Sequence, residues 1–160
     1  MKSKNSILIA LSFIFLLSAC KSSHKLSGEY VSATFAPQCI GVDTKGNQKL
    51  RVWGKGANRQ QAIRNAMQGA LAAVLFDGIQ GEGKCMKQPM VSLVNAREKY
   101  KEYFNNFFEI GSKYSNFVKL DNDKDSQIEA KNQSQEHWSI LVTVDTEALQ
   151  TQLMRDGIIK

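Results

Sequence analysis

Histidine, cysteine and proline are scarce in this chain, which has two, three and two of them in 160 residues. His24 lies in a polar segment and His137 at the start of a predicted strand, so neither offers a catalytic triad. The cysteines and histidines also lack the spacing of zinc ligands. We therefore expect no enzymatic activity, no metal site and no cofactor.

The longest hydrophobic run, 7–17, is too short to cross a membrane, because ~11 to 13 apolar residues fall short of the ~20 that a spanning helix needs. Two lysines precede the run, and Leu17-Ser18-Ala19-Cys20 follows it. This is the layout of a secretory signal with a small-residue cleavage site. The junction resembles the lipobox of bacterial lipoproteins, whose cysteine is lipidated and becomes the first residue of the mature chain.

This junction divides the chain. We expect residues 1–19 to be a signal peptide, 20–28 a lipidated tether and 29–160 a single domain. Cys20 is the predicted lipid attachment site, and acyl chains such as palmitate at ~0.8 kcal/mol per buried methylene would make the anchor permanent. Lys21, rather than aspartate, follows the anchor. By analogy with the sorting rule of enteric-type envelopes, this favours the outer membrane, with the domain facing the periplasm or the cell exterior.

The net charge is basic but diffuse. The 21 basic and 15 acidic residues give +6, and removal of Lys2 and Lys4 with the signal leaves +4. The lysines and arginines are spread along the chain. Such a surface favours anionic lipid headgroups or acidic glycans, whereas nucleic-acid binding would need a dense basic stripe with stacking aromatics. We expect no nucleic-acid partner.

Cys39 and Cys85 remain once Cys20 is assigned to lipid. An even pair in an exported, oxidising compartment favours a disulfide. The bridge would close a loop worth roughly 4 kcal/mol in the chain-entropy model. Two free buried thiols are the alternative.

Hydrophobic periodicity predicts the secondary structure. Alternation and turn residues predict a strand at 29–35 and a hairpin of strands 39–42 and 49–54. Asn58 and Gln61 resemble a capping box at the start of a helix that ends at Asp77-Gly78. The remaining predicted elements are a helix over 91–110 with Gly111 as its C-cap, strands at 117–120, 127–131 and 137–145, and a final helix from 145 or 146 to Gly157.

Three short motifs resemble ligand-binding loops, but each lacks a feature that its loop requires. Gly78 to Lys84 has phosphate-loop spacing, but it follows a helix and Cys85 replaces the magnesium-binding hydroxyl. Gly54-Lys55-Gly56 lacks the third glycine of a dinucleotide turn, so we interpret it as a close strand–helix contact. Asp121 to Asp125 opens like a calcium loop without its glycine or final glutamate. We expect no nucleotide, and weak calcium binding stays an alternative.

Aromatic residues are concentrated in the predicted second helix. Tyr100, Tyr103, Phe104 and Phe107 follow helical spacing together with Phe108. Rings at this spacing favour core packing, but five on one helix exceed what a small sheet covers easily. The first four are therefore also a candidate interaction surface.

Two segments resemble a known envelope module. Arg51-Val-Trp-Gly-Lys-Gly-Ala-Asn58 leads into alanines spaced along a helix, and Trp138-Ser-Ile-Leu-Val-Thr-Val-Asp145 precedes a helix closed by Gly157. This pattern is similar to the amino-terminal domain of the flagellar-assembly protein T and to the related lipoprotein-20 family. The resemblance implies an α+β fold: a small, mostly antiparallel sheet with about three helices packed mainly on one face.

The resemblance also implies an envelope location and a scaffolding role without catalytic residues. Neither the cysteine pair nor the aromatic helix maps onto the family, and a flagellar role is not implied. Our leading hypothesis is a non-enzymatic scaffold or interaction component of an envelope assembly, with an envelope protein as partner. A binding module for acidic glycan or peptidoglycan is the alternative, and a small hydrolase built on a carboxylate pair is the third.

Overall fold

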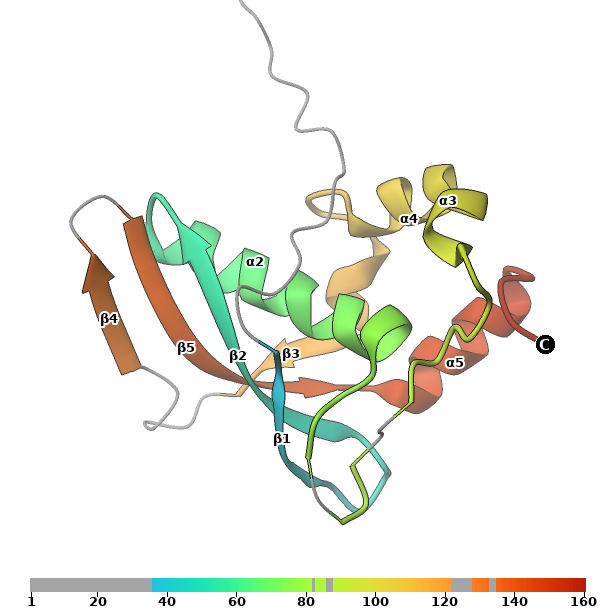
Figure 1. Cartoon of the computed structure of the whole chain (residues 1–160), viewed down its shortest axis with the longest axis horizontal. Coiled ribbons are helices and arrows are strands. Elements are labelled where there is room, and N and C mark those ends of the chain that lie inside the picture. Colours follow the sequence, from blue (N-terminus) through green and yellow to red (C-terminus); the bar gives the residue numbers. More distant parts are fainter. Residues whose placement is uncertain (1–35, 82, 86–87, 122–127, 133–134) are drawn as a thin grey trace, which may run out of the picture.

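The computed structural model describes residues 36–81, 83–85, 88–121, 128–132 and 135–160 (Figure 1). They form an α+β fold, as expected, while the predicted strand 29–35 lies outside them. The strands are β1 (Gln38–Val42), β2 (Gln48–Gly56), β3 (Val118–Leu120), β4 (Ile128–Asn132) and β5 (Gln135–Val144). The helices are α2 (Arg59–Ala72), the π-helical turn η2 (Ala73–Asp77), α3 (Ala96–Lys99), α4 (Lys101–Phe108), the 3-10 turn η3 (Lys113–Asn116) and α5 (Thr146–Arg155).

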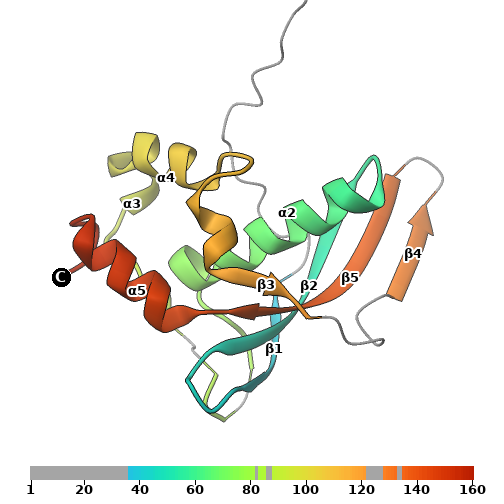
Figure 2. The same ribbon diagram turned by 180° about the vertical axis from the view of Figure 1, so that it is seen from behind.

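The sheet is antiparallel at every pairing and is built around β5. Its order is β1-β2-β5-β3, and β4 also pairs with β5. One edge of β5 pairs with β2 from Gly56↔Glu136 to Gln48↔Val144. On its other edge, β3 pairs near Val144 and β4 near Gln135. The two opposite views show α2 lying along the sheet and α3, α4 and α5 grouped at one end (Figures 1 and 2).

Strand β2 turns alternate residues towards α2. Leu50 and Val52 are fully buried, as are Gly54 and Gly56 further along. A Cβ atom on Gly54 would lie 1.9 Å from the carbonyl oxygen of Ala62 in α2. A Cβ atom on Gly56 would lie 2.5 Å from the backbone nitrogen of Ala62. The expected close strand–helix contact is therefore confirmed, and only glycine permits it.

Helix α2 begins where the sequence predicts, and its π-helical continuation η2 ends at Asp77, where the sequence predicts the end of the helix. The Asn58 side chain accepts from the Gln61 backbone N–H at 2.9 Å, and the Gln61 side chain accepts from Ala57. Alanines at four-residue spacing form its buried stripe. The polar pattern of this helix predicts that Gln68 faces solvent, and the structure shows that prediction to be wrong. Gln68 is 8% exposed and donates to the Phe108 carbonyl at 2.7 Å, because α4 covers that side of α2.

The alternation of apolar residues over 137–145 predicts a strand with one buried face, but the middle of β5 has buried residues on both faces. Ile140, Val142 and Val144 lie in the core, yet Ser139 and Leu141 are also buried at 4% and 9% exposure. Pairing with strands on both edges makes β5 the central strand of the described sheet.

The predicted single helix over 91–110 is wrong. The backbone N–H groups of Met90 and Val91 donate to the carbonyls of Val74 and Leu75, which holds this segment extended. Asn95 then adopts a left-handed conformation with φ of 58°, and Tyr100 separates α3 from α4. Helix α4 ends at Phe108 with Glu109 as its C-cap, and the predicted C-cap Gly111 has a positive φ three residues beyond.

The C-terminal helix closes the core. Asp145 accepts from the Ala148 backbone N–H at 3.0 Å, so it is the N-cap of α5. Leu149 and Leu153 are fully buried in the same hydrophobic cluster as the buried residues of α2 and α4. Gly157 has a φ of 70° just after the helix, as its predicted end requires. One core therefore joins both ends of the described chain.

Candidate functional site

The predicted disulfide between Cys39 and Cys85 is confirmed. Their sulfur atoms are 1.97 Å apart, and the Cα atoms are 6.1 Å apart. The backbone N–H of Cys39 also donates to Gln80 at 3.0 Å. Together these links fasten the edge strand β1 to the loop after η2. Cys20, the predicted lipid attachment site, lies outside the described residues.

The candidate interaction residues separate into two groups. Phe104 and Phe107 are 1% and 3% exposed, so they belong to the core and cannot present their rings to a partner. Their rings contact Phe76, Phe117 and other aromatics at centroid distances between 4.7 and 6.1 Å. Tyr100 and Tyr103 are only partly buried. An interaction role for these two tyrosines stays a prediction.

Tyr103 connects α4 to α5 through a polar network. Its hydroxyl donates to Asp156 at 2.8 Å, and Gln152 donates to both Asp156 carboxylate oxygens at 2.8 and 2.9 Å. Burial, reinforced by the bond to Asp156, raises the pKa of Tyr103 above its usual range. The bonds from Gln152 and Tyr103 lower the pKa of Asp156. The network therefore holds a neutral phenol against a carboxylate.

A pocket of ≈ 520 Å³ opens between α4 and η3. Phe107 and Tyr103 contribute its aromatic wall, and Lys113 contributes a positive charge. Its other lining residues are small or polar: Asn106, Gly111, Ser112, Ser115 and Asn116. Amide and hydroxyl groups beside one cation can hydrogen-bond a polar, anionic small ligand.

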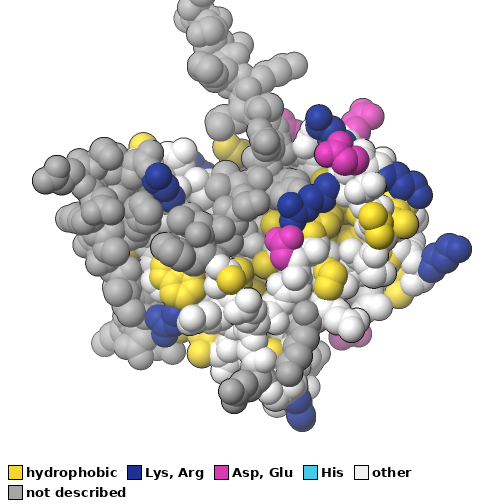
Figure 3. Space-filling view, in the orientation of Figure 1, with side chains coloured by type: hydrophobic (Ala, Val, Ile, Leu, Met, Phe, Trp, Pro, Cys, Tyr) yellow, Lys and Arg dark blue, Asp and Glu magenta, His cyan; other side chains and the backbone are white. Residues whose placement is uncertain are grey.

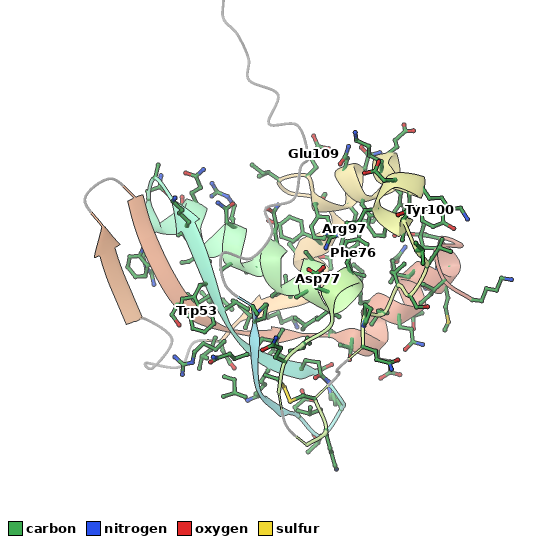
Figure 4. All side chains as sticks on the ribbon, viewed as in Figure 1. Trp53, Phe76, Asp77, Arg97, Tyr100 and Glu109 are labelled. Carbon is green, nitrogen blue, oxygen red and sulfur yellow. A yellow bond between two sulfur atoms is a disulfide. The ribbon has the colours of Figure 1, made fainter. Side chains whose placement is uncertain are left out.

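A second feature lies before α3, where the chain exposes two neighbouring apolar residues. Leu93 is 45% exposed and Val94 is 81% exposed. Just behind them, Arg97 forms a 2.7 Å ion pair with Asp77 and lies 4.7 Å from the Phe76 ring centroid (Figure 4). These contacts attach α3 to the end of η2, so the exposed turn is held in place. We call Leu93 and Val94 the apolar turn.

The apolar turn borders a smaller pocket of ≈ 300 Å³ that Leu93, Phe76 and Arg97 line with four neighbouring residues. Figure 3 shows hydrophobic side chains exposed on one face of the molecule, next to basic and acidic ones. Exposed apolar side chains held in a fixed turn are suited to protein–protein contact.

Two of the motifs that resemble ligand loops lie partly in the described residues. Residues 78–81 and 83–85 run through the loop between η2 and α3 rather than from a strand into a helix. Of the calcium-like segment, Asp121 is described and pairs with Lys49 at 4.0 Å. Among the described residues, no group of three histidine, cysteine, aspartate or glutamate side chains could hold a metal ion.

Comparison with protein-family models, characterised proteins and solved structures finds no match to this chain. In the described residues, no helix has both the length and the apolar character required to cross a membrane. The functional argument therefore depends on the residues and their geometry.

Sequence reasoning missed the partners of the aromatic helix. Asp156 accepts the hydrogen bond of Tyr103 from 53 positions away in the sequence, and Gln152 in turn donates to Asp156. No local pattern links either residue to Tyr103. Their own spacing of four residues, which lets side chains meet on one helical turn, was the available signal. The sequence did not predict the apolar turn, because the predicted helix over 91–110 includes Leu93 and Val94 whereas α3 begins only at Ala96.

Proposed function

We propose that this protein is a lipid-anchored lipoprotein of the bacterial cell envelope, attached through Cys20 and located at the outer membrane. The junction Leu17-Ser18-Ala19-Cys20 supports the anchor. The disulfide between Cys39 and Cys85 supports export, because such bridges persist in oxidising compartments. Lys21 after the anchor supports the outer membrane by the sorting analogy.

Within this location we infer a non-enzymatic role, as a scaffold or interaction component of an envelope assembly. The apolar turn is the observation that carries it. Val94 is 81% exposed and the ion pair between Arg97 and Asp77 fixes the turn that presents it. A preformed apolar contact costs little ordering entropy on binding. Its partner would be another envelope protein, and Tyr100 would add aromatic surface nearby in sequence.

Cross-linking in intact cells tests this role. A photo-reactive residue at position 94 should capture one reproducible envelope protein, identified by mass spectrometry. The matched control is position 154, because Met154 is also exposed, at 46%, but lies on α5. In the chain that carries the photo-reactive residue at position 94, Leu93→Lys should abolish the adduct without unfolding the domain. Equal capture from both positions would contradict a docking role for the apolar turn.

The pocket beside Lys113 supports a second candidate, a binding module for an acidic glycan or peptidoglycan. Its amide, hydroxyl and ammonium groups match the hydrogen-bonding groups of a carboxylated sugar. Soluble peptidoglycan fragments should then bind wild-type protein and fail to bind Lys113→Glu. Leu93→Lys/Val94→Lys serves as the control, because the apolar turn lies outside this pocket.

The anchor has a test of its own. In a bacterial host with an outer membrane, the wild-type chain should incorporate a labelled fatty acid and partition into detergent. Cys20→Ser should lose both properties, whereas Cys39→Ser should keep the label. Equal labelling of Cys20→Ser and wild type would refute the assignment of Cys20.

A further inference from the structure

We propose that the pocket beside Lys113 is one half of a site for a peptide that carries both a free carboxylate and a free amine. The peptide stems of peptidoglycan have this chemistry. The inference rests on the second candidate function, a binding module for acidic glycan or peptidoglycan. It deepens that function, because it assigns the peptide rather than the glycan strand as the ligand and adds a second pocket.

The second pocket lies along α5 and has a volume of ≈ 410 Å³. Its lining includes three charged residues, Asp145, Glu147 and Arg155, together with Phe117 and Gln152. We call it the α5 pocket, and we call the pocket of ≈ 520 Å³ between α4 and η3 the α4 pocket. Charged and polar side chains line both pockets, so each can hold a polar group of a ligand.

The two pockets share a wall of side chains. Phe107 of the α4 pocket stacks on Phe117 of the α5 pocket, with 5.8 Å between the ring centroids and 15° between the ring planes. Tyr103 of the α4 pocket and Gln152 of the α5 pocket both donate to the Asp156 carboxylate. The two linings are therefore joined by a ring contact and by a hydrogen-bond network, which places the pockets next to each other.

A basic residue of each pocket lies near this wall. Hydrogen bonds, first from Gln152 and then from Tyr103, lower the pKa of Asp156. The positive charges of Lys113 and Arg155 lower the pKa of this carboxyl further. Lys113 lines the α4 pocket and Arg155 lines the α5 pocket. Because charge attraction weakens with distance, both pockets reach the surroundings of Asp156.

The charges of the two pockets differ in sign. The α4 pocket presents the Lys113 ammonium beside amide and hydroxyl groups, a combination that can bind a carboxylate. The α5 pocket has two carboxylates, Asp145 and Glu147, against the one guanidinium of Arg155. Asp145 accepts from the Ala148 backbone N–H as the N-cap of α5, so the exposed Glu147 is the carboxylate that can receive an amine. Among the residues that the structure describes, neither Lys113 nor Glu147 belongs to an ion pair.

This arrangement favours a ligand with both signs of charge over a polyanionic glycan. A chain of carboxylated sugars would place like charges beside Asp145 and Glu147, and such contacts weaken binding. A peptide with a carboxylate at one position and an amine at another meets the opposite charge in each pocket. The α5 pocket therefore selects against the acidic glycan that the α4 pocket alone would accept.

Calorimetric titration of the full chain in a neutral detergent tests this ligand class with three probes. The first is the tripeptide L-alanyl-γ-D-glutamyl-meso-diaminopimelic acid, which carries carboxylates and amines but no sugar. The second is the same tripeptide with its amines acetylated, which keeps the carboxylates and loses the positive charges. The third is peptide-free glycan strands, whose lactyl groups end in carboxylates and which therefore represent the acidic glycan.

We expect the tripeptide to bind, and its acetylated form to bind about tenfold more weakly, because the contact with Glu147 is lost. Glu147→Gln should weaken the binding of the tripeptide by the same factor and leave the binding of the acetylated form unchanged. Lys113→Gln should weaken the binding of both forms by about tenfold, because both keep their carboxylates.

Glu98→Gln and Lys101→Gln are the matched controls, because they remove the same charges from exposed residues that line neither pocket. Both should bind every probe as the wild type does. All four substituted side chains are exposed, so the urea midpoints of the variants should equal that of the wild type.

The outcomes separate this inference from the function on which it rests. Binding of the glycan strands without binding of the tripeptide would overturn the peptide assignment and leave the binding module standing. Absence of binding for all three probes would overturn both. Tripeptide binding that neither Lys113→Gln nor Glu147→Gln weakens would overturn the two-part site, and equal weakening of both tripeptide forms by Glu147→Gln would overturn its amine contact.

Discussion

Gly54 determines how closely β2 and α2 approach at the scale of single residues. Because Gly54 has no side chain, the backbone of Ala62 can lie against it. On the helix, the small side chains of the buried residues Ala62 and Ala66 allow the same close approach. The contact is between backbones, so no rotamer change can relieve a collision there. Its glycine requirement is therefore steric rather than conformational.

Gly54→Ala should destabilise the domain by about 3 kcal/mol, because the new Cβ would lie 1.9 Å from the Ala62 oxygen. Urea unfolding of both proteins measures the change. Gly41→Ala is the matched control on β1, where an added Cβ meets nothing within 4 Å, and should shift stability little. Equal effects at the two sites would mean that α2 can move away from the sheet.

Tyr103→Phe removes the hydrogen bond to Asp156 and should cost about 1 kcal/mol at neutral pH. The folded pKa of Tyr103 is raised, so its contribution is present below its unfolded value of about 10 and is lost as the pH rises through the folded value. Tyr103→Phe should thus remove an alkaline loss of stability. Unfolding free energies measured from neutral to alkaline pH test this, with Tyr100→Phe as the control.

The contribution of Asp156 to stability depends on pH in the opposite direction. Hydrogen bonds from Gln152 and then Tyr103 lower its folded pKa, so its contribution is present above about pH 3.9 and is lost as the pH falls through the folded value. Asp156→Asn should therefore flatten the acid side of the stability profile. An unchanged acid side would show that the network contributes nothing to folding.

At the scale of elements, local signals predicted most of the fold. The hairpin, both ends of the first helix and the cap of α5 follow from alternation, Asn58 and Asp145, which act within four residues. The extended segment at Met90 and Val91, where the sequence predicts a helix, was not predictable in this way. It depends on Met90 and Val91 bonding back to Val74 and Leu75, a contact that forms only once η2 is in place.

The same distinction holds for the candidate site. Cysteine parity predicted the disulfide, and helical spacing identified the aromatic cluster. Helical spacing could not separate the buried Phe104 and Phe107 from the half-buried tyrosines. All four residues lie in α4 or at its N-cap, Tyr100, and share its helical spacing. Which ring meets solvent depends on how α5 and η3 cover the helix.

The disulfide should stabilise the domain by roughly 4 kcal/mol, since it closes a loop of 46 residues in the unfolded chain. Cys39→Ser/Cys85→Ser should lower the urea midpoint accordingly, and a reducing agent should lower it in wild type but not in the double variant. Identical midpoints for both proteins would indicate that β1 is held by its backbone pairing alone.

At the scale of the whole molecule, the sheet depends on a strand near the end of the chain. β5 pairs with β2, β3 and β4, whereas β1 pairs with β2. Without β5 the described sheet is reduced to the β1–β2 hairpin, and an isolated hairpin is marginal in water.

A chain truncated after residue 134 should therefore fail to fold, although it keeps α2, the disulfide cysteines and the aromatic cluster. Far-ultraviolet circular dichroism and urea titration would measure the loss of cooperative unfolding. A chain truncated after Gly157 is the control, because it retains β5 and α5. A cooperative transition in the shorter chain would contradict the central role of β5.

The position of β5 has a consequence for the timing of folding. Translation delivers β1, β2 and α2 well before the strand that holds them together, so the emerging chain has no stable sheet to close on. A protein exported in an extended state must avoid folding before it passes through a narrow channel. If the protein is exported as we propose, the order of the strands supplies that delay, because folding follows the arrival of β5 and α5, residues 135–160.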